Sequence, residues 1–192
     1  MKKLGFYFNM DACIGCRTCQ IACKDKNNLE VGALYRKVES YEAGKFPQPK
    51  YYHFSRTCNH CENPACMAAC PTDSYSVAAD GTVQHNMLTC IGCLSCKDAC
   101  PYDVPQFFEE IEKVHKCDFC KDLIDQGQSP ACVAACLQRC LEWGDLDELK
   151  KKYGSGSVSE LPVKAPADMT GPSAMIKPKA GALDTKPVRV EI

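Results

Sequence analysis

The stretch Cys13-Ile-Gly-Cys-Arg-Thr-Cys-Gln-Ile-Ala-Cys23 spaces four cysteines as C-x2-C-x2-C-x3-C, and this spacing decides the fold. Residues 90–100, CIGCLSCKDAC, repeat the spacing. Two related runs read C-x2-C-x4-C-x3-C over residues 58–70 and C-x2-C-x11-C-x3-C over residues 117–136. Sixteen of the 17 cysteines fall into these four runs, and only Cys140 is left over. Four sets of four cysteines at ferredoxin spacing predict four [4Fe–4S] clusters in a chain that carries electrons.

The spacing has a geometric reason. Three closely spaced thiolates can hold three iron corners of one cubane, whereas the fourth Cys follows about one helical turn later, ~5 Å further along. In two-cluster ferredoxins this fourth Cys therefore ligates the neighbouring cluster. Gly15 and Gly92 lie inside the loops, where the absence of a Cβ lets the backbone approach the cluster. Pro71 and Pro101 follow the fourth Cys as in ferredoxins, whereas Leu137 stands in that place in the last run.

Two other uses of cysteine are disfavoured. The N-terminus MKKLGFYFNMDACIGC lacks the apolar core and cleavage site of a signal peptide, and disulfide scaffolds are usually much shorter than 192 residues. Structural zinc is the second possibility, because C-x2-C pairs also bind zinc. Zinc sites normally combine two ligand pairs, however, and here three cysteines crowd each of two short loops.

Composition excludes several classes of function. The formal net charge is −1, and no basic stripe with interleaved aromatic residues indicates nucleic-acid binding. The sequence contains no run of 18 apolar residues, so a membrane-spanning helix is not expected. Because cysteine is counted in the 45% hydrophobic fraction, the core is thin, and we expect the apoprotein to fold poorly without its clusters. No nucleophile–base constellation indicates catalysis by this chain, so it is not expected to be an enzyme by itself.

The four runs alternate in the order A-B-A-B with a period of about 75 residues, which indicates a repeated two-cluster unit. We predict an α+β fold of two ferredoxin-like units related by a pseudo-two-fold repeat, followed by an extended C-terminal arm. The spacing leaves the pairing of runs open between a sequential and a nested order. The gap from Cys70 to Cys90 is shorter than that from Cys23 to Cys58, which favours a compact middle unit.

The pattern of apolar residues and turns predicts short elements between the loops. Strands are expected over residues 3–9, 35–42, 50–56, 75–79 and 82–86, and an extended pair over 106–116. Helices are expected over residues 65–70, 95–100, 118–126 and 147–153. From Gly154 onward, prolines punctuate a polar stretch, which predicts the extended arm over 154–192.

The chain resembles the iron–sulfur electron-transfer (beta) subunits of molybdopterin oxidoreductases of the dimethyl sulfoxide reductase type. The resemblance runs from about residue 5 to residue 153 and rests on the segments GFYFNMDACIGCRTCQIACKDKN, CNHCENPAC, CIGCLSCKDACPYDVPQF, KCDFC and LEWGDLDELKKKYG. The x2-x11-x3 spacing of the fourth run is close to that branch.

The resemblance implies nested pairing, with the outer unit formed by residues 1–57 and 101–153 and the inner unit by residues 58–100. The implied ligand sets are Cys13, Cys16, Cys19 and Cys136; Cys23, Cys117, Cys120 and Cys132; Cys58, Cys61, Cys66 and Cys100; and Cys70, Cys90, Cys93 and Cys96. Some relatives lack a cysteine in the third run, but Cys96 is present here, so four [4Fe–4S] clusters are expected. Cys140 is expected to be a spare buried thiol, with ligand exchange with Cys136 as the alternative. His60 is expected to lie near a cluster without binding iron.

The same resemblance implies a non-catalytic relay in anaerobic respiration. Electrons would pass between a donor, either a quinol-oxidising membrane subunit or a soluble carrier, and a larger catalytic subunit with a molybdenum or tungsten bis-pyranopterin guanine dinucleotide. Residues 154–192 would embrace that subunit, with a disordered tail as the alternative. The cysteine runs are also compatible with a relay for a formate dehydrogenase or hydrogenase that runs in the oxidative direction, and with a free polyferredoxin. Assembly is expected in the cytoplasm, with export alongside a partner bearing a twin-arginine signal as a variant. The substrate is not encoded in this chain.

Overall fold

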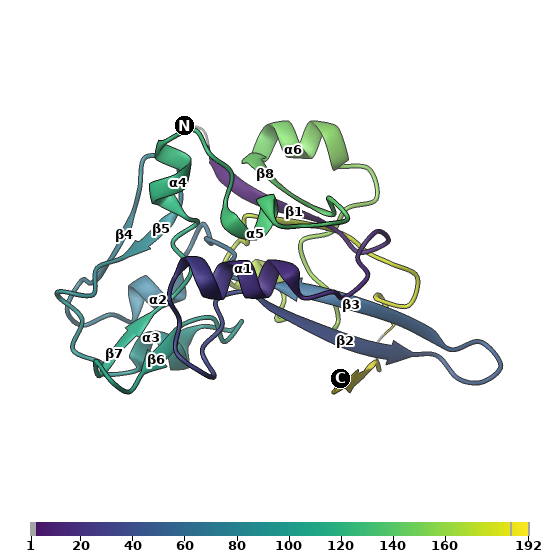
Figure 1. Cartoon of the computed structure of the whole chain (residues 1–192), viewed down its shortest axis with the longest axis horizontal. Coiled ribbons are helices and arrows are strands. Elements are labelled where there is room, and N and C mark those ends of the chain that lie inside the picture. The colour runs from purple at the N-terminus through teal and green to yellow at the C-terminus, as the bar shows by residue number, and fades with distance from the viewer. Residues whose placement is uncertain (1–2, 185, 192) are drawn as a thin grey trace.

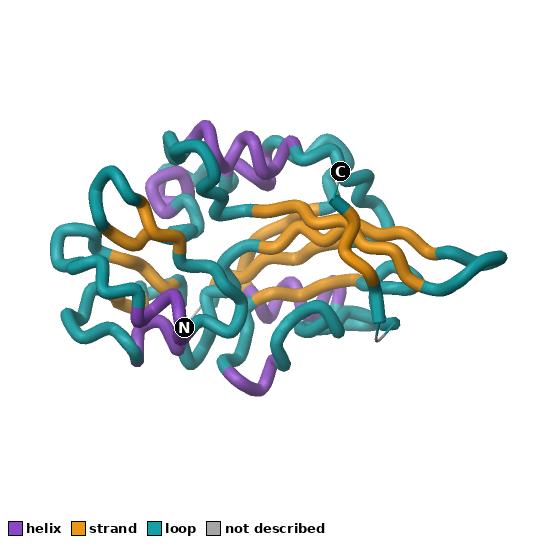
Figure 2. Tube along the Cα trace, turned by 90° about the horizontal axis from the view of Figure 1, so that it is seen from below, coloured by secondary structure: helices purple, strands orange, loops and turns teal. Residues whose placement is uncertain are grey.

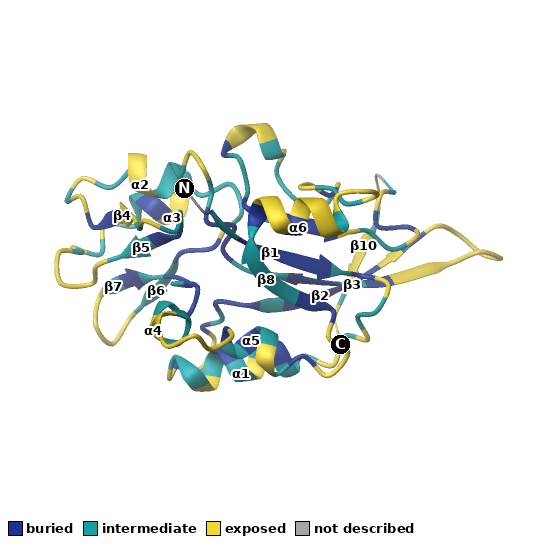
Figure 3. Cartoon of the chain, turned by 90° about the horizontal axis from the view of Figure 1, so that it is seen from above, coloured by how far each residue is buried: buried dark blue, intermediate teal, exposed yellow. Residues whose placement is uncertain are grey.

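The larger half of the molecule contains two three-stranded sheets, shown in a computed structural model that describes residues 3–184 and 186–191 (Figure 1). In the first sheet, β1 (Leu4–Asn9) lies between β8 (Leu141–Asp145), which is antiparallel, and β9 (Ala174–Lys177), which is parallel. Strand β1 is a continuous apolar run because it is buried on both faces. Figure 3 shows this burial along β1.

The second sheet has the order β10-β2-β3, with β2 (Lys37–Ala43), β3 (Lys50–Arg56) and β10 (Val188–Val190) all antiparallel to their neighbours. Tyr41 lies opposite Tyr52 in the register, and their rings stack with centroids 5.3 Å apart. Such a cross-strand aromatic pair holds the register of the hairpin. The tip of the β2–β3 hairpin is exposed, as Figure 3 shows.

The smaller half consists of two short hairpins and two short helices, which lie together on the left of Figure 1. Their bounds are β4 (Tyr75–Val77) with β5 (Val83–His85), β6 (Gln106–Phe108) with β7 (Lys113–His115), α2 (Ala65–Ala68) and α3 (Ser95–Ala99). Tyr75, Val83, Cys96 and Val114 form their shared core, against which Phe107 packs. The β6–β7 hairpin therefore packs with the inner runs, although it follows them in sequence.

The remaining helices lie on both sides of the central strands, as Figure 2 shows. They are α1 (Thr18–Lys26), α4 (Lys121–Asp125), α5 (Ala131–Ala134), α6 (Leu146–Tyr153) and a single 3₁₀ turn, η1 (Ala167–Met169). Helix α6 begins at the cap residue Asp145, whose Oδ1 accepts from the backbone N–H groups of Asp147 and Glu148. Its buried Leu149 faces the first sheet, and Tyr153 stacks on Tyr7 with centroids 3.8 Å apart. No helix among the described residues is long and apolar enough to cross a membrane.

The C-terminal region differs from the predicted extended arm. Residues 154–184 and 186–191 fold back on the body of the chain, where β9 pairs with β1 and β10 pairs with β2. Leu161, Ile176 and Ala182 are buried in the main core. Pairing explains the difference, because β9 satisfies the backbone groups on one edge of β1, a contact that a search for local periodicity could not find. This region also reaches the inner runs, since the Ser173 hydroxyl donates to the carbonyl of His60 at 2.8 Å.

Candidate metal centres

The four cysteine runs share one local backbone conformation. The residue two places after the first Cys has a positive φ in every run: Gly15 (71°), His60 (42°), Gly92 (70°) and Phe119 (67°). In the last three runs its backbone N–H donates to the Sγ of that first Cys, at 3.4 to 3.5 Å. Gly15 also hydrogen-bonds to Cys13 and lowers the pKa of this thiol. Backbone N–H groups aimed at cysteine sulfur stabilise thiolates, as a cluster requires.

The two loop glycines have reasons beyond approach to a cluster. A Cβ on Gly15 would collide with the imidazole of His53, and a Cβ on Gly92 would collide with the carbonyl of Glu112. Both positions also have a φ that disfavours a side chain. In this structure the groups that approach these two glycines closely are therefore other parts of the protein, namely the His53 ring and the Glu112 carbonyl.

We name the four predicted ligand sets site A (Cys13, Cys16, Cys19, Cys136), site B (Cys23, Cys117, Cys120, Cys132), site C (Cys58, Cys61, Cys66, Cys100) and site D (Cys70, Cys90, Cys93, Cys96). The structure brings the first run beside the fourth, because α1 packs on α5. It brings the second run beside the third, because α2 packs on α3. Each helix carries cysteines of its run, so this packing brings cysteines of distant runs near one another.

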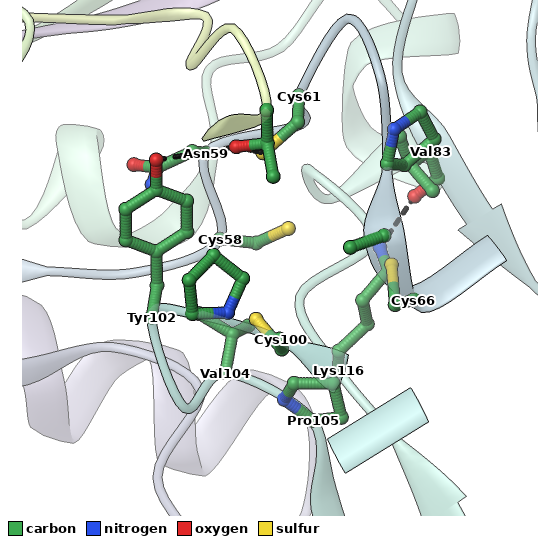
Figure 4. Close-up of a pocket in the computed structure, with 14 residues that line it drawn as sticks. Cys58, Asn59, Cys61, Cys66, Val83, Cys100, Tyr102, Val104, Pro105 and Lys116 are labelled. Atoms are coloured by element: carbon green, nitrogen blue, oxygen red, sulfur yellow. Dashed lines mark hydrogen bonds between the residues drawn. The ribbon is translucent and has the colours of Figure 1, made fainter. Parts of the chain in front are cut away.

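The four thiols of site C line one cavity. Figure 4 shows the sulfur atoms of Cys58, Cys61, Cys66 and Cys100 around a common space. The Thr170 hydroxyl donates to Cys61 Sγ at 3.2 Å. Burial raises the pKa of Cys66 to about 12 even though Lys116 acts in the opposite direction, so a free thiol here stays protonated and a bound cation would favour the thiolate.

The four thiols of site A line a second cavity, together with Cys140. Cys140 Sγ lies 3.4 Å from Cys136 Sγ. A hydrogen bond with Cys140 is the main cause that lowers the pKa of Cys13 to about 7, while the same contact raises the pKa of Cys140. Cys140 is thus a buried thiol against two predicted ligands.

The other two sites contrast in burial. All four thiols of site B are buried, and burial raises the pKa of Cys23 to about 12 and of Cys120 to about 11, with Cys132 contributing to both. In site D, Cys96 is buried whereas Cys93 is exposed. The backbone N–H of Ser74 donates to Cys70 Sγ at 3.3 Å.

The donor sets fit a group larger than one ion. Across residues 3–184 and 186–191, no three His, Cys, Asp or Glu side chains converge closely enough to hold a single metal ion. A tetrahedral zinc site would need such convergence. At site C four cysteine thiols line one cavity, and an all-cysteine donor set is the kind that holds [4Fe–4S] clusters.

His60 has a structural role. It is completely buried, its Nδ1 accepts from the backbone N–H of Val83 at 3.0 Å, and its backbone N–H donates to Cys58 Sγ. Burial lowers the pKa of His60 well below its usual value, so the ring is neutral. Its ring thus ties the second run to β5.

Sequence reasoning missed the buried Arg36 and the buried hydroxyl of Thr170, and it named Lys116 as a cation beside the motifs that could offset cluster charge, with a solvated position as the alternative. Arg36 and Lys116 rank among the largest side chains that are completely enclosed, and Lys116 lines the cavity of site C. Lys116 Nζ donates to the carbonyls of Val83 and Cys117. Thr170 belongs to the C-terminal region and stands 109 positions after Cys61 in the sequence, although its hydroxyl donates to that thiol. Position alone offers no signal for Arg36 or Thr170, whereas Lys116 stands directly before a predicted ligand.

Comparisons with known proteins agree with these features. Residues 49–146 match the family model described as a 4Fe-4S dicluster domain, and residues 12–74 match a second model of the same description. The B subunit of the anaerobic dimethyl sulfoxide reductase of Haemophilus influenzae is 40% identical over 188 residues, which cover 93% of this chain and 90% of the relative. The Escherichia coli protein of the same name is 38% identical over 192 residues, with coverage of 95% and 92%.

The B subunit of the polysulfide reductase of Wolinella succinogenes is 34% identical over 191 residues, which cover 96% of this chain and 99% of the relative. Identity at this level over nearly the whole length of each protein includes the C-terminal region as well as the cysteine runs. The chain therefore belongs to the family of iron–sulfur electron-transfer subunits of dimethyl sulfoxide reductase-type molybdopterin oxidoreductases.

Proposed function

We propose that this chain is a non-catalytic relay that carries electrons one at a time through four [4Fe–4S] clusters, bound at sites A to D. The observation that carries the proposal is the cavity of site C, where three thiols of one run meet a fourth thiol from another run. This is the shared ligation that a two-cluster ferredoxin unit requires. Each cluster would add one-electron redox chemistry, while the chain supplies thiolates, N–H donors and exclusion of water.

Nested pairing is supported by the two helix pairs. The packing of α1 on α5 favours shared sites A and B, and the packing of α2 on α3 favours shared sites C and D. Neighbouring thiols suggest the order A-B-C-D, since the burial that raises the pKa of Cys117 is reinforced by Cys58 of site C as well as by Cys23 of its own site. A linear order would let electrons pass between clusters in successive short steps.

We further propose the two-unit organisation and its pseudo-two-fold repeat. The outer unit would comprise residues 1–57 and 101–153 with sites A and B, and the inner unit residues 58–100 with sites C and D. By sequence the β6–β7 hairpin falls within the outer unit, although it packs on the core of the inner unit. The C-terminal region bridges both units, because β9 joins the outer sheet while Thr170 reaches site C.

The partner would be a larger subunit with the molybdenum or tungsten pterin cofactor, together with a membrane anchor where quinol is the donor. Exposed apolar residues stand two positions before the exposed cysteines at the proposed ends of the relay: Ile14 before Cys16 and Ile91 before Cys93. Such positions suit contact with a donor on one side and an acceptor on the other. The dimethyl sulfoxide and polysulfide reductase relatives support a reductase in preference to an oxidative dehydrogenase. Assembly in the cytoplasm, with or without export beside a partner, is part of the same proposal.

Metal analysis tests the proposal. We expect the anaerobically purified protein to be brown and to contain about sixteen iron atoms per chain, four for each of four clusters. Stoichiometric zinc with almost no iron would refute the relay. Co-purification of a large pterin-containing subunit would identify the complex, and isolation of the iron-loaded chain without any partner would favour a free polyferredoxin.

A further inference from the structure

Arg36 is a buried cation without a counterion among protein carboxylates. Its side chain is 2% exposed, and no carboxylate in the described part of the chain forms an ion pair with it. Its Nε and Nη2 have no hydrogen-bond partner among residues 3–184 and 186–191. A guanidinium stays charged in proteins, and an uncompensated buried charge is strongly destabilising. Something anionic must therefore act on Arg36 in the folded protein.

The groups that could supply this negative charge are cysteines of sites A and B once they are bound as thiolates. Nη1 donates to the Ser55 hydroxyl at 3.1 Å, and this hydroxyl lies 3.5 Å from Cys19 Sγ of site A. On the other side, the backbone N–H of Arg36 hydrogen-bonds to Cys23 of site B and lowers the pKa of that thiol against the effect of burial. One residue thus reaches a ligand of each site.

The charges around Arg36 favour site B. Burial by itself would lower the pKa of the guanidinium, but negative charge on nearby thiolates raises it overall. The contributing thiols are Cys132, Cys19, Cys117 and Cys23, three of which belong to site B. The side chain therefore lies between two sites with more anionic neighbours in the second.

An aromatic surface sets the orientation of the guanidinium. Its central carbon lies 5.0 Å from the centroid of the Phe6 ring, and Phe6 stacks on Phe119 at 4.1 Å. Phe119 in turn donates its backbone N–H to Cys117 of site B. A guanidinium held over a ring keeps its N–H groups free to donate to anions at its edge.

We infer that Arg36 is a positioning residue shared by sites A and B, whose unpartnered Nε and Nη2 would donate to sulfur of a bound cluster at site B and which acts on site A through Ser55. The inference rests on the proposed function. One-electron reduction adds a negative charge to a cluster without a proton, and a fixed positive charge beside it favours the reduced form. Arg36 therefore raises the reduction potential of both clusters, and more strongly at site B.

Arg36→Met tests this inference in the holoprotein. A potentiometric titration followed by electron paramagnetic resonance should show the reduced-to-oxidised ratio at site B fall about tenfold at a fixed potential, which corresponds to about 59 mV for one electron. The reduction potential of site A should fall by a smaller amount, and the potentials of sites C and D should stay unchanged. Signals of sites C and D are assigned from their change in Cys61→Ser and Cys96→Ser.

Three further variants separate this role from a structural one. Arg36→Lys keeps the charge but not the planar donor fork, so it should restore part of the shift. Arg189→Gln removes an arginine charge at an exposed position, where the side chain pairs with Glu39, and should leave all four potentials unchanged. If Arg36→Met fails to assemble, Ser55→Ala decides, because it should lower the potential of site A alone.

The outcomes are distinguishable from a failure of the relay itself. A preparation without iron would refute the proposed function. Full iron content with unchanged potentials in Arg36→Met, or equal shifts at all four sites, would refute only the role of Arg36. An unchanged site A potential in Ser55→Ala would refute the connection through the hydroxyl.

Discussion

The outer and inner halves of this molecule carry the same cysteine spacing in different surroundings. At sites A and B most thiols are buried and lie beside two three-stranded sheets. At sites C and D only Cys58 and Cys96 are buried, and the supporting hairpins have three residues per strand. The same cysteine spacing is therefore supported by a large core in the outer half and by a small one in the inner half.

The two buried cations differ in the same way. Lys116, beside site C, donates to two backbone carbonyls. Arg36, between sites A and B, leaves Nε and Nη2 without protein partners. Lys116 therefore contributes to the backbone structure of the inner half, while two donors of Arg36 have no partner among the described residues and could serve a bound cluster.

Removal of iron should have the largest effect, and it should destabilise the inner half more than the outer half. We expect anaerobic chelation to reduce hydrogen-exchange protection in β4 to β7 by at least about 100-fold, because these hairpins have little core besides the thiols and the clusters. Strands β1 to β3 should retain more protection, since their core contains many aromatic and aliphatic side chains. Loss of protection at the same chelator concentration in both halves would contradict the comparison.

Cys96→Ser should alter one site of the inner half. Cys96 is buried in the small core with Tyr75 and Val83, so its loss should change or remove the cluster at site D and interrupt electron transfer. Iron should fall by up to about four atoms per chain while three clusters persist. Unchanged paramagnetic spectra would contradict the assignment of this ligand.

Lys116→Met should destabilise the inner half. The substitution leaves the carbonyls of Val83 and Cys117 without their donor, which should cost about 2 kcal/mol in the free energy of unfolding. Denaturant titration of the iron-loaded protein measures this loss. Lys151→Met, which changes an exposed lysine on α6, is the matched control and should change stability by less than about 0.5 kcal/mol.

Thr170→Val and Thr18→Val each remove one hydroxyl that donates to a cysteine, the first in the inner half and the second in the outer half. The hydroxyl of Thr170 donates to Cys61 Sγ at 3.2 Å, and that of Thr18 donates to Cys16 Sγ at 3.3 Å. Loss of either hydrogen bond should destabilise the reduced state of one cluster by ~1 kcal/mol. This corresponds to a reduction potential lower by roughly 40 mV for one electron. Thr170→Val should affect site C alone and Thr18→Val site A alone, and a shift at the opposite site would argue against the ligand sets.

Cys140→Ala should have the smallest effect. Cys140 contacts Cys136 at 3.4 Å, so its removal should lower the potential of site A slightly and leave the iron content unchanged. Loss of about four iron atoms per chain would show instead that Cys140 is a ligand.

Several elements could be predicted from sequence because their signals are local. The strand expected over residues 50–56 is found with those bounds, and β1 begins within one residue of its prediction. The short helices after the third Cys in the second and third runs are also found, one or two residues shorter than expected. Strand β8 was missed, since Leu141–Asp145 shows no clean alternation and is held by its pairing with β1.

The amino-acid sequence by itself determined the type of cluster, the predicted ligands and the family, because metal-ligand spacing is written within a few consecutive residues. Three features depend on the tertiary structure: which runs lie together, the return of the C-terminal region that brings Thr170 to Cys61, and the burial of Arg36 with its Nη1 on Ser55. These contacts join residues far apart in the chain, so they depend on the packing of the whole molecule, which no local pattern records.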